Sequence, residues 1–352
     1  MPAPLARHIS SDAYIFMKVA INGFGRIGRT FFRQAFGAKD IEVVAINDLT
    51  DEATLAYLLK YDTVYGRYEK SVEAVEEGGK KYLAIDGKKV LSLTEKDPES
   101  LPWEKLAVDV VVESTGVFAF DSGAQKHIKA GAKYAVVSAP AKGNVPHVLI
   151  GTNTKDLGKG NVISNASCTT NASGPVAAVM SENPGVEKAL LTAVHGYTSS
   201  QALVDGPNKK LARGRAAAQN IVLTTTGAAE ATAKAIPELE GLFTGVALRV
   251  PVSAGSVIDF TFVAKRNVTA EEINEIFEKA AKEQRWQGIL EVTREPLVSS
   301  DILKTTAGAI VDLNHTRVVG GNLVKVFAWY DNEWGYSAML LREVLEIGKL
   351  LR

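Results

Sequence analysis

The chain has 352 residues, of which 46% are hydrophobic and 23% are charged, a composition that excludes a largely disordered or low-complexity protein. At about 150 residues per domain, this length predicts two domains or three. Forty basic residues balance forty acidic ones, so no net charge favours a primary nucleic-acid role or an anionic membrane surface. No run approaches the roughly 18 consecutive apolar residues of a membrane-spanning helix, so we expect no membrane partner.

The only cysteine is Cys168, which excludes an intramolecular disulfide and fits a reducing cytosol, so we expect a cytoplasmic protein. Residues 1–16 contain one arginine, no sustained apolar core and no clear small-residue cleavage site, and they make a poor signal peptide. We interpret them as an N-terminal extension: a tail, a remnant, or the product of an upstream start with Met17 as the internal start. A targeting role is the alternative.

Residues 17–166 have the pattern of an α/β domain of the doubly wound, Rossmann type. Their apolar runs are short, continuous and rich in β-branched residues, as expected of parallel strands that are buried on both faces. We predict strands at 17–22, 41–47, 108–112 and 134–137, and a helix at 26–36.

Residues 167–333 mix strands with helices, which predicts an α+β catalytic domain. We predict strands at 246–250 and 257–264 and a helix at 269–282. This helix opens with the capping box Thr269 and Glu272, and its apolar positions lie on one face. A last helix is predicted at 339–351.

Three glycines follow the first predicted strand in the spacing G-x-G-x-x-G: Gly23, Gly25 and Gly28. The motif alone is weak, but a preceding strand and a following helix are the context that a dinucleotide site requires. The first glycine permits a tight turn, the second lets a pyrophosphate approach the backbone, and the third lets helix and strand pack closely. The N-terminus of the helix then offers N–H groups and a partial positive charge to the phosphates.

Asp48 ends the second predicted strand, twenty residues beyond Gly28. A carboxylate there can accept hydrogen bonds from the adenosine ribose hydroxyls and would repel a 2′-phosphate, which predicts NAD rather than NADP as the cofactor. The alternative is an aspartate that only shapes a turn.

Cys168 lies in the small, polar stretch SNASCTTN, directly before a predicted helix at 172–180. A thiol at a helix N-terminus has its thiolate stabilised by the helix dipole and free N–H groups, which makes Cys168 a candidate nucleophile. His195 ends a predicted strand 27 residues later; as an imidazolium it would stabilise a thiolate, and as an imidazole it would act as a base. The alternatives are an inert buried cysteine and a structural histidine. One cysteine and scattered histidines give no plausible zinc spacing, so we expect no metal.

From Met17 onward the chain resembles the phosphorylating, NAD-dependent glyceraldehyde-3-phosphate dehydrogenase family. The resemblance rests on NGFGRIGR at 22–29, SNASCTTN at 164–171 and WYDNEWGYS at 329–337, with shorter motifs between them in the family's order. It implies a Rossmann-type domain over 17–166, a catalytic domain over 167–333, and a C-terminal helix, 334–352, that returns to the first domain.

The resemblance also implies a reaction. The Cys168 thiolate attacks the aldehyde of glyceraldehyde 3-phosphate, and His195 assists proton transfer at the hemithioacetal. Hydride transfer to NAD leaves a thioester on Cys168, and inorganic phosphate then releases 1,3-bisphosphoglycerate. A thioester preserves the energy of oxidation for transfer to phosphate, and the Cys168 N–H is a candidate oxyanion donor.

Further site residues are implied by similarity alone. For the substrate phosphate they are Thr198, Ser200 and Arg249; for the attacking phosphate, Ser167, Thr169, Arg213, Thr226 and Gly227; for the cofactor, Arg26, Ile27, Thr115, Gly116, Asn332 and Tyr336. The segment from about 197 to 215 resembles a loop that packs against neighbouring subunits, so a homotetramer is the expected assembly. Two other functions stay open: an erythrose-4-phosphate dehydrogenase of the same superfamily, and a non-enzymatic nucleotide-binding module.

Overall fold

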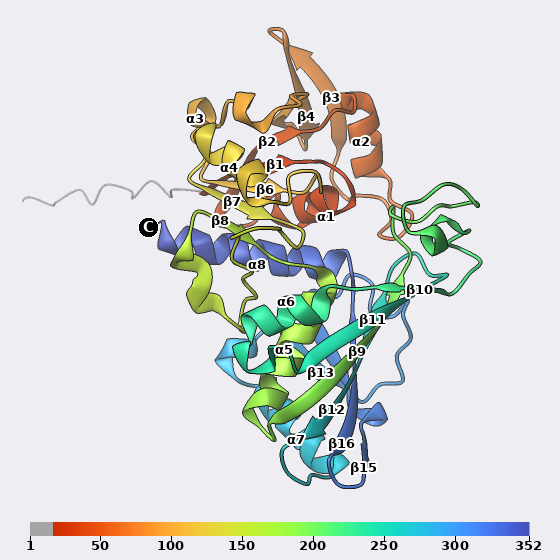
Figure 1. The fold of residues 1–352 in the computed structure, drawn as a ribbon. Coiled ribbons are helices and arrows are strands. Elements are labelled where there is room, and N and C mark those ends of the chain that lie inside the picture. The colour runs from red at the N-terminus through yellow and green to blue at the C-terminus, as the bar shows by residue number, and fades with distance from the viewer. Residues whose placement is uncertain (1–16, 352) are drawn as a thin grey trace, which may run out of the picture.

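The computed structural model describes residues 17–351, which form two eight-stranded sheets with helices packed against them (Figure 1). The expectations for the N-terminal extension 1–16 and for Arg352 at the end of the last predicted helix lie outside the described residues.

The first sheet has the strand order β3-β4-β5-β2-β1-β6-β7-β8. Its strands are β1 Met17–Asn22, β2 Ile41–Asn47, β3 Val72–Glu77, β4 Lys80–Ile85, β5 Lys88–Leu93, β6 Val110–Glu113, β7 Tyr134–Val137 and β8 Val162–Ser164. The accompanying helices are α1 Arg26–Ala35, α2 Glu52–Lys60, α3 Trp103–Leu106 and α4 Asp121–Lys129, with 3-10 turns at Pro98–Ser100 and Thr154–Lys159.

The centre of this sheet is parallel: β1 pairs in parallel with β2 on one side and with β6 on the other. The chain runs from β1 through α1 to β2 and later returns to β6, so the strand order reverses beside β1. In an open α/β sheet, a ligand binds at the carboxyl ends of the strands at such a reversal. This topology therefore places the glycine loop after β1 and Asp48 after β2 at one edge.

The second sheet has the order β10-β11-β9-β12-β16-β14-β13, with β15 paired to β16. Its strands are β9 Val186–Gly196, β10 Val222–Thr225, β11 Phe243–Val250, β12 Ser256–Ala264, β13 Leu290–Thr293, β14 Ala309–Asp312, β15 Arg317–Val319 and β16 Leu323–Tyr330. The remaining helices are α5 Cys168–Glu182, α6 Ala228–Ala235, α7 Ala270–Ala280 and α8 Trp334–Leu350, with 3-10 turns at Leu211–Gly214, Pro237–Leu239, Gln284–Trp286 and Leu313–His315.

Residues of the second sheet alternate between a buried and a more exposed position, most regularly along β12. Its buried side chains form one core with those of α5 and α7. This alternation is the pattern of a sheet that is covered by helices on one face only.

Helix α8 lies between the two sheets (Figure 1, blue). Leu340, Val344 and Ile347 pack into the core of the first sheet, whereas Ala338 and Met339 belong to the core of the second. The C-terminal helix therefore returns to the first domain, and the predicted fold class is confirmed. The domain limits near residues 166 and 333 stay a prediction.

Several predicted bounds are wrong. The strand predicted at 108–112 is Val110–Glu113. The helix predicted from its apolar pattern at 339–351 begins earlier, at Trp334, where the resemblance placed its start. The helix predicted at 172–180 also begins earlier, because Ser167 caps it by accepting the N–H of Thr170, which makes Cys168 its first residue. The antiparallel strands β3 and β4 were not predicted.

Candidate active site

A cavity of 770 Å³ opens at the carboxyl ends of β1 and β2. Four of the residues predicted to bind the cofactor line it: Gly23, Gly25, Asp48 and Thr115. Gly28, Arg26, Ile27 and Gly116 lie next to these in the chain but are not among the lining residues.

The glycine loop has the close approaches that the motif predicts. A Cβ on Gly28 would stand 2.2 Å from the carbonyl oxygen of Gly23, and a Cβ on Gly23 would stand 2.6 Å from the backbone nitrogen of Thr115. A Cβ on Gly25 would meet nothing within 4 Å, so this glycine leaves open space before α1. The loop therefore fits a pyrophosphate at the N-terminus of α1.

Asp48 is held in place by two backbone groups. Its Oδ2 accepts the N–H of Phe24 at 2.7 Å and its Oδ1 accepts the N–H of Thr50 at 3.0 Å. These bonds fix the carboxylate at the cavity wall, beside the glycine loop. A fixed carboxylate at this point fits the ribose hydroxyls of a dinucleotide.

A buried polar network supports the strand ends beneath the cavity. The carboxylate of Glu113 accepts from the Nδ2 of Asn22 at 2.6 Å and lies 2.9 Å from the Nε2 of His127. The indole N–H of Trp103 lies 3.1 Å from the Nδ1 of His127. Because an indole can only donate, Nδ1 is the acceptor and Nε2 carries the proton that is donated to Glu113.

This network was missed in the sequence, and no local signal could have found it. His127 lies on α4, Trp103 on α3 and Glu113 at the end of β6, and only the packing of α4 against the sheet brings them together. Glu113 also accepts from the backbone N–H of Thr115 at 2.9 Å, so the network fixes a residue that lines the cavity.

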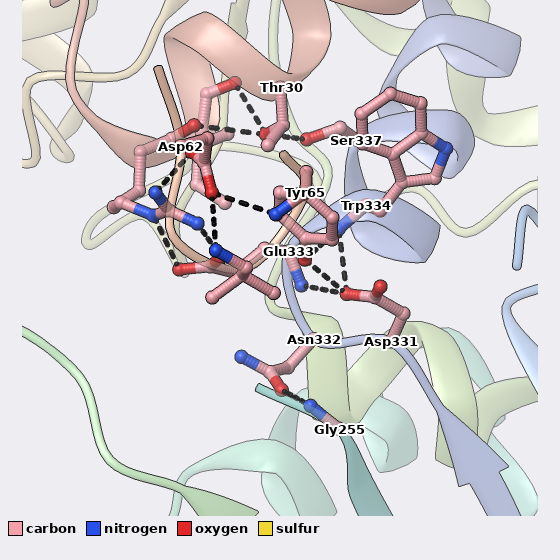
Figure 2. A network of polar contacts seen from close by, with 12 residues as sticks. Thr30, Asp62, Tyr65, Gly255, Asp331, Asn332, Glu333, Trp334 and Ser337 are labelled. Atoms are coloured by element: carbon pink, nitrogen blue, oxygen red, sulfur yellow. Dashed lines mark hydrogen bonds and ion pairs between the residues drawn. The ribbon is translucent and has the colours of Figure 1, made fainter. Parts of the chain in front are cut away.

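On the other side of the site, Asn332 is oriented by the start of β12. Its Oδ1 accepts the N–H of Gly255 at 3.0 Å and the hydroxyl of Ser256 at 2.9 Å. Since a backbone N–H can only donate, the oxygen must face Gly255, and the Nδ2 group points away from it (Figure 2). The amide therefore presents a donor, as a residue that binds a carboxamide oxygen would.

Tyr336, the other residue predicted beside the nicotinamide, is buried in α8. Its hydroxyl has no hydrogen-bond partner within residues 17–351. Burial raises the pKa of this phenol well above its usual range, and the nearby groups Glu343 and Cys168 add to the shift.

Cys168 and His195 are in direct contact. The Sγ of Cys168, at the first position of α5, lies 3.3 Å from the Nε2 of His195, near the end of β9. This is the pairing of nucleophile and base that the sequence predicted across 27 residues. The imidazole is almost completely buried, so its orientation is fixed by its neighbours.

Two groups surround the other nitrogen of His195. The carbonyl oxygen of Gly196 lies 2.6 Å from Nδ1, and Nη1 of Arg249 lies 2.7 Å from Nδ1 and 3.0 Å from the same carbonyl. The Nη1–H of Arg249 can donate to Nδ1, in which case Nε2 carries the proton, or to the Gly196 oxygen, in which case Nδ1–H donates to the other lone pair of that oxygen. In the second arrangement Nε2 is an unprotonated acceptor that faces the thiol.

The charges around this pair favour the neutral histidine. Burial, assisted by the positive charge of Arg249, lowers the pKa of His195 to about 3. Burial also raises the pKa of the Cys168 thiol, although Arg249 and the helix N–H groups act in the opposite direction. The sequence analysis left two roles open for His195, an imidazolium that stabilises a thiolate and an imidazole that acts as a base, and these pKa shifts favour the second.

Tyr330, at the end of β16, is a site residue that the sequence analysis did not single out. Its hydroxyl lies 3.0 Å from the Oγ1 of Thr169, and its ring makes an edge contact with His195 at 6.1 Å between centroids. Tyr330 therefore packs between Thr169 and the imidazole and limits the orientations of both.

The residues predicted to bind the substrate phosphate lie in two different places. Thr198 and Ser200 share a hydrogen bond of 2.9 Å, and Nη1 of Arg213 donates to Ser200 at 3.3 Å. Arg249, predicted with them, instead lies against His195. Arg213, predicted in the second group, therefore contacts the first.

In the second group, most of the predicted hydroxyls have partners at helix starts. Ser167 caps α5, Thr226 accepts the N–H of Ala228 at 3.1 Å, and Gly227 precedes the first residue of α6. The Nε of Arg213 donates to Thr224 at 2.9 Å, which ties the guanidinium to β10, just before Thr226. Two helix N-termini and one guanidinium suit an anion.

We expect His195→Asn to lower the rate at which iodoacetamide alkylates Cys168 at pH 7 by about a hundredfold, because the variant removes the base that accepts the thiol proton. The measurement is the loss of free thiol with time. Tyr330→Phe, which keeps the ring and the base, is the control and should react nearly as fast as the wild type. Equal rates in the wild type and His195→Asn would show that the histidine does not act on the thiol.

Two features of residues 17–351 bear on other functions. No helix in this range is long and apolar enough to cross a membrane. The same residues contain no cluster of three or more His, Cys, Asp or Glu that could hold a metal ion.

Comparison with known proteins identifies the family. Residues 17–121 match the family model described as the NAD binding domain of glyceraldehyde 3-phosphate dehydrogenase, and residues 167–332 match the model of its C-terminal domain. Curated relatives named glyceraldehyde-3-phosphate dehydrogenase include those of Streptomyces coelicolor, 48% identical over 95% of this chain and 99% of the relative, and Geobacillus stearothermophilus, 48% identical over 91% and 95%. That of Mycobacterium leprae is 47% identical over 95% and 99%.

These matches confirm the resemblance seen in the sequence and, through the NAD binding domain, the predicted cofactor. The chain belongs to the glyceraldehyde-3-phosphate dehydrogenase family.

Proposed function

We propose that the protein oxidises D-glyceraldehyde 3-phosphate with NAD and transfers the acyl group to inorganic phosphate, forming 1,3-bisphosphoglycerate. The observation that carries this proposal is the 3.3 Å contact between Cys168 and His195 at the N-terminus of α5. A thiol with a buried base beside it is the arrangement that nucleophilic catalysis through a thioester requires. The names of the relatives give the substrate class.

The reaction begins with proton transfer from the Cys168 thiol to the Nε2 of His195. The sulfur attacks the aldehyde carbon, and the carbonyl oxygen accepts an N–H from the first turn of α5, where these groups have no helical partner. The protonated His195 returns its proton to this oxygen, which becomes the hemithioacetal hydroxyl, and the imidazole is again a base. Arg249 holds the imidazole through the Gly196 carbonyl, so Nε2 stays directed at the reacting atoms.

Bound NAD would supply the acceptor for the hydride that leaves the hemithioacetal carbon as the thioester forms. Asp48, the glycine loop and Thr115 would hold its adenosine and pyrophosphate, and Asn332 and Tyr336 would hold the nicotinamide. His195 takes the proton of the hemithioacetal hydroxyl during oxidation. Inorganic phosphate then attacks the thioester carbon, and the Cys168 sulfur leaves.

Two anion sites serve the substrate phosphate and the attacking phosphate. We assign Thr198, Ser200 and Arg249 to the first and Ser167, Thr169, Thr226 and Gly227 to the second. Arg213 contacts Ser200 and Thr224, so its guanidinium lies between the two groups and serves both.

The acyl acceptor gives the most direct test. We expect NAD reduction with glyceraldehyde 3-phosphate to require inorganic phosphate or arsenate, and to be faster than with erythrose 4-phosphate. Cys168→Ser should lower turnover by about a thousandfold or more while the Kd for NAD changes by less than about twofold, because the hydroxyl is a poor nucleophile in the same shape. Phosphate-independent turnover, or a faster rate with erythrose 4-phosphate, would contradict the proposal.

Asp48 sets the choice of cofactor. We expect Asp48→Ala to reduce the preference for NAD over NADP by about tenfold or more, because the repulsion of a 2′-phosphate and the bonds to the ribose are lost together. The measurement is kcat/KM with each cofactor. Asp86→Ala, in an exposed turn, is the control and should leave the ratio unchanged.

A homotetramer is supported by the uncovered face of the second sheet. The strand register places nine apolar residues on the face away from α5, and one of them, Trp329, is covered by Ile302, Ala307 and Ile310. The other eight are Leu190, Val194, Leu223, Val246, Leu248, Val257, Val263 and Phe327. Further exposed apolar side chains, Leu203, Val204 and Leu211, lie on the segment between β9 and β10, which projects from the molecule (Figure 1). Apolar surfaces of this extent are typical of subunit interfaces.

The assembly is tested by mass in solution. We expect four chain masses of 37.7 kDa for the wild type and a smaller assembly for the double variant Leu190→Asp/Val246→Asp, because charges would be buried at the interface. These side chains are 60% and 51% exposed, and Leu350→Asp, at a position 54% exposed at the end of α8, is the matched control. Light scattering that shows a wild-type monomer would overturn the assignment.

We also propose a cytoplasmic location. A single free cysteine that acts as a nucleophile needs a reducing compartment, because oxidation of its sulfur would end catalysis.

A further inference from the structure

The side chain of Arg26 does not line the cofactor cavity, although Arg26 belongs to the glycine loop. Its Nε and Nη2 donate to the two carboxylate oxygens of Glu333, and its Nη1 donates to Asp62. The fork to Glu333 joins α1 to the residue that precedes α8, across 307 positions of the chain. The guanidinium thus connects the pyrophosphate end of the site to the C-terminal segment.

These groups are well removed from water. The exposed fractions of the side chains are 34% for Arg26, 14% for Glu333 and 5% for Asp62. Burial alone would lower the pKa of the Arg26 guanidinium, but the bonds to Glu333 and Asp62 outweigh it and raise that pKa. The guanidinium is therefore held charged between two carboxylates in a fixed geometry.

Asn332, the residue assigned to the nicotinamide carboxamide, directly precedes Glu333 in the chain. Asp331, on the other side of Asn332, accepts the hydroxyl of Tyr65 at 2.8 Å and the N–H of Glu333 at 2.9 Å (Figure 2). Asn332 is thus held between two carboxylates, each bonded to a residue of the first domain. Its own side chain is oriented by Gly255 of the second.

We propose that Arg26 is a positioning residue for the nicotinamide: through Glu333 it fixes the backbone that carries Asn332, whereas only the backbone of Arg26 serves the pyrophosphate. The proposal rests on the assignment of Asn332 under the proposed function. It makes Arg26 and Glu333 determinants of how the reactive ring is held rather than of how the adenosine half binds.

A direct contact between the Arg26 side chain and the pyrophosphate is the competing role. To make it, the guanidinium would have to leave Glu333 and Asp62, and both mostly buried carboxylates would lose their cation. Uncompensated buried charge is costly, so the observed fork opposes that movement.

Binding of NAD and of ADP-ribose separates the two roles, because ADP-ribose has the adenosine and pyrophosphate but lacks the nicotinamide. We expect Arg26→Gln and Glu333→Gln each to raise the Kd for NAD by about tenfold, the size of effect of losing a charge-assisted hydrogen bond. The Kd for ADP-ribose should change by less than about twofold. The measurement is calorimetric titration of the full chain.

The double variant and a control complete the test. If the pair acts as a unit, Arg26→Gln/Glu333→Gln should bind NAD about as weakly as either single variant. Arg294→Gln removes a similar ion pair, with Glu278, from the exposed region near α7 and should change neither Kd. Equal weakening of NAD and ADP-ribose by Arg26→Gln, with Glu333→Gln unaffected, would overturn the proposal.

Two further measurements distinguish a failure of this proposal from misfolding of a variant and from a failure of the proposed function. Circular dichroism shows whether Arg26→Gln folds; if it does not, Glu333→Gln alone decides, since unchanged NAD binding there would refute the coupling. Phosphate-dependent turnover of the wild type tests the proposed function. A wild type that turns over, combined with variants that lose NAD and ADP-ribose equally, would refute only the role of Arg26.

Discussion

The contact between a thiol at the start of α5 and an imidazole near the end of β9 is the constraint on which the site depends. The parallel register of β9 and β11 places Arg249 directly beside His195, and the antiparallel pairing of β12 with β16 places Tyr330 at the same end of the sheet. All of these side chains lie on the face that α5 covers. The sheet therefore presents His195, Arg249 and Tyr330 to one helix N-terminus, whereas Thr198, Ser200 and Arg213 of the proposed anion sites come from the segment between β9 and β10.

The predicted cofactor cavity instead lies at the carboxyl ends of the parallel strands of the first sheet. There, the strand ends are stabilised by a buried carboxylate, Glu113, whose partners come from β1, α4 and the turn after β6. The nicotinamide side is not part of that sheet at all. It is held by the segment 331–333, which receives hydrogen bonds from both halves of the molecule and leads into α8, a helix that belongs to both cores.

The two ends of the site also differ in the charged groups that surround their arginines. Burial, assisted by the positive charge of the neighbouring Arg249, lowers the pKa of His195 and favours its neutral form. Arg26 stands between two carboxylates and has no such effect on a reacting group. Two arginines of the same sequence thus have opposite surroundings, and only the three-dimensional partners distinguish a guanidinium that tunes a base from one that joins two segments.

The sequence by itself determined the family and the fold class, and it predicted the candidate site residues, because glycine spacing, a strand-end aspartate and a lone cysteine in a polar stretch are local features. It also predicted that Cys168 and His195 would meet. Only the tertiary structure decided burial and the contacts between residues that are far apart in the chain. It places His195 against Cys168 in a buried setting that favours the neutral imidazole, since burial is a property of the packed site. It also directs the Arg26 side chain to Asp62 and Glu333, which lie 36 and 307 residues away in the chain. The buried triad of Trp103, Glu113 and His127 likewise exists only once α3, α4 and β6 have packed together.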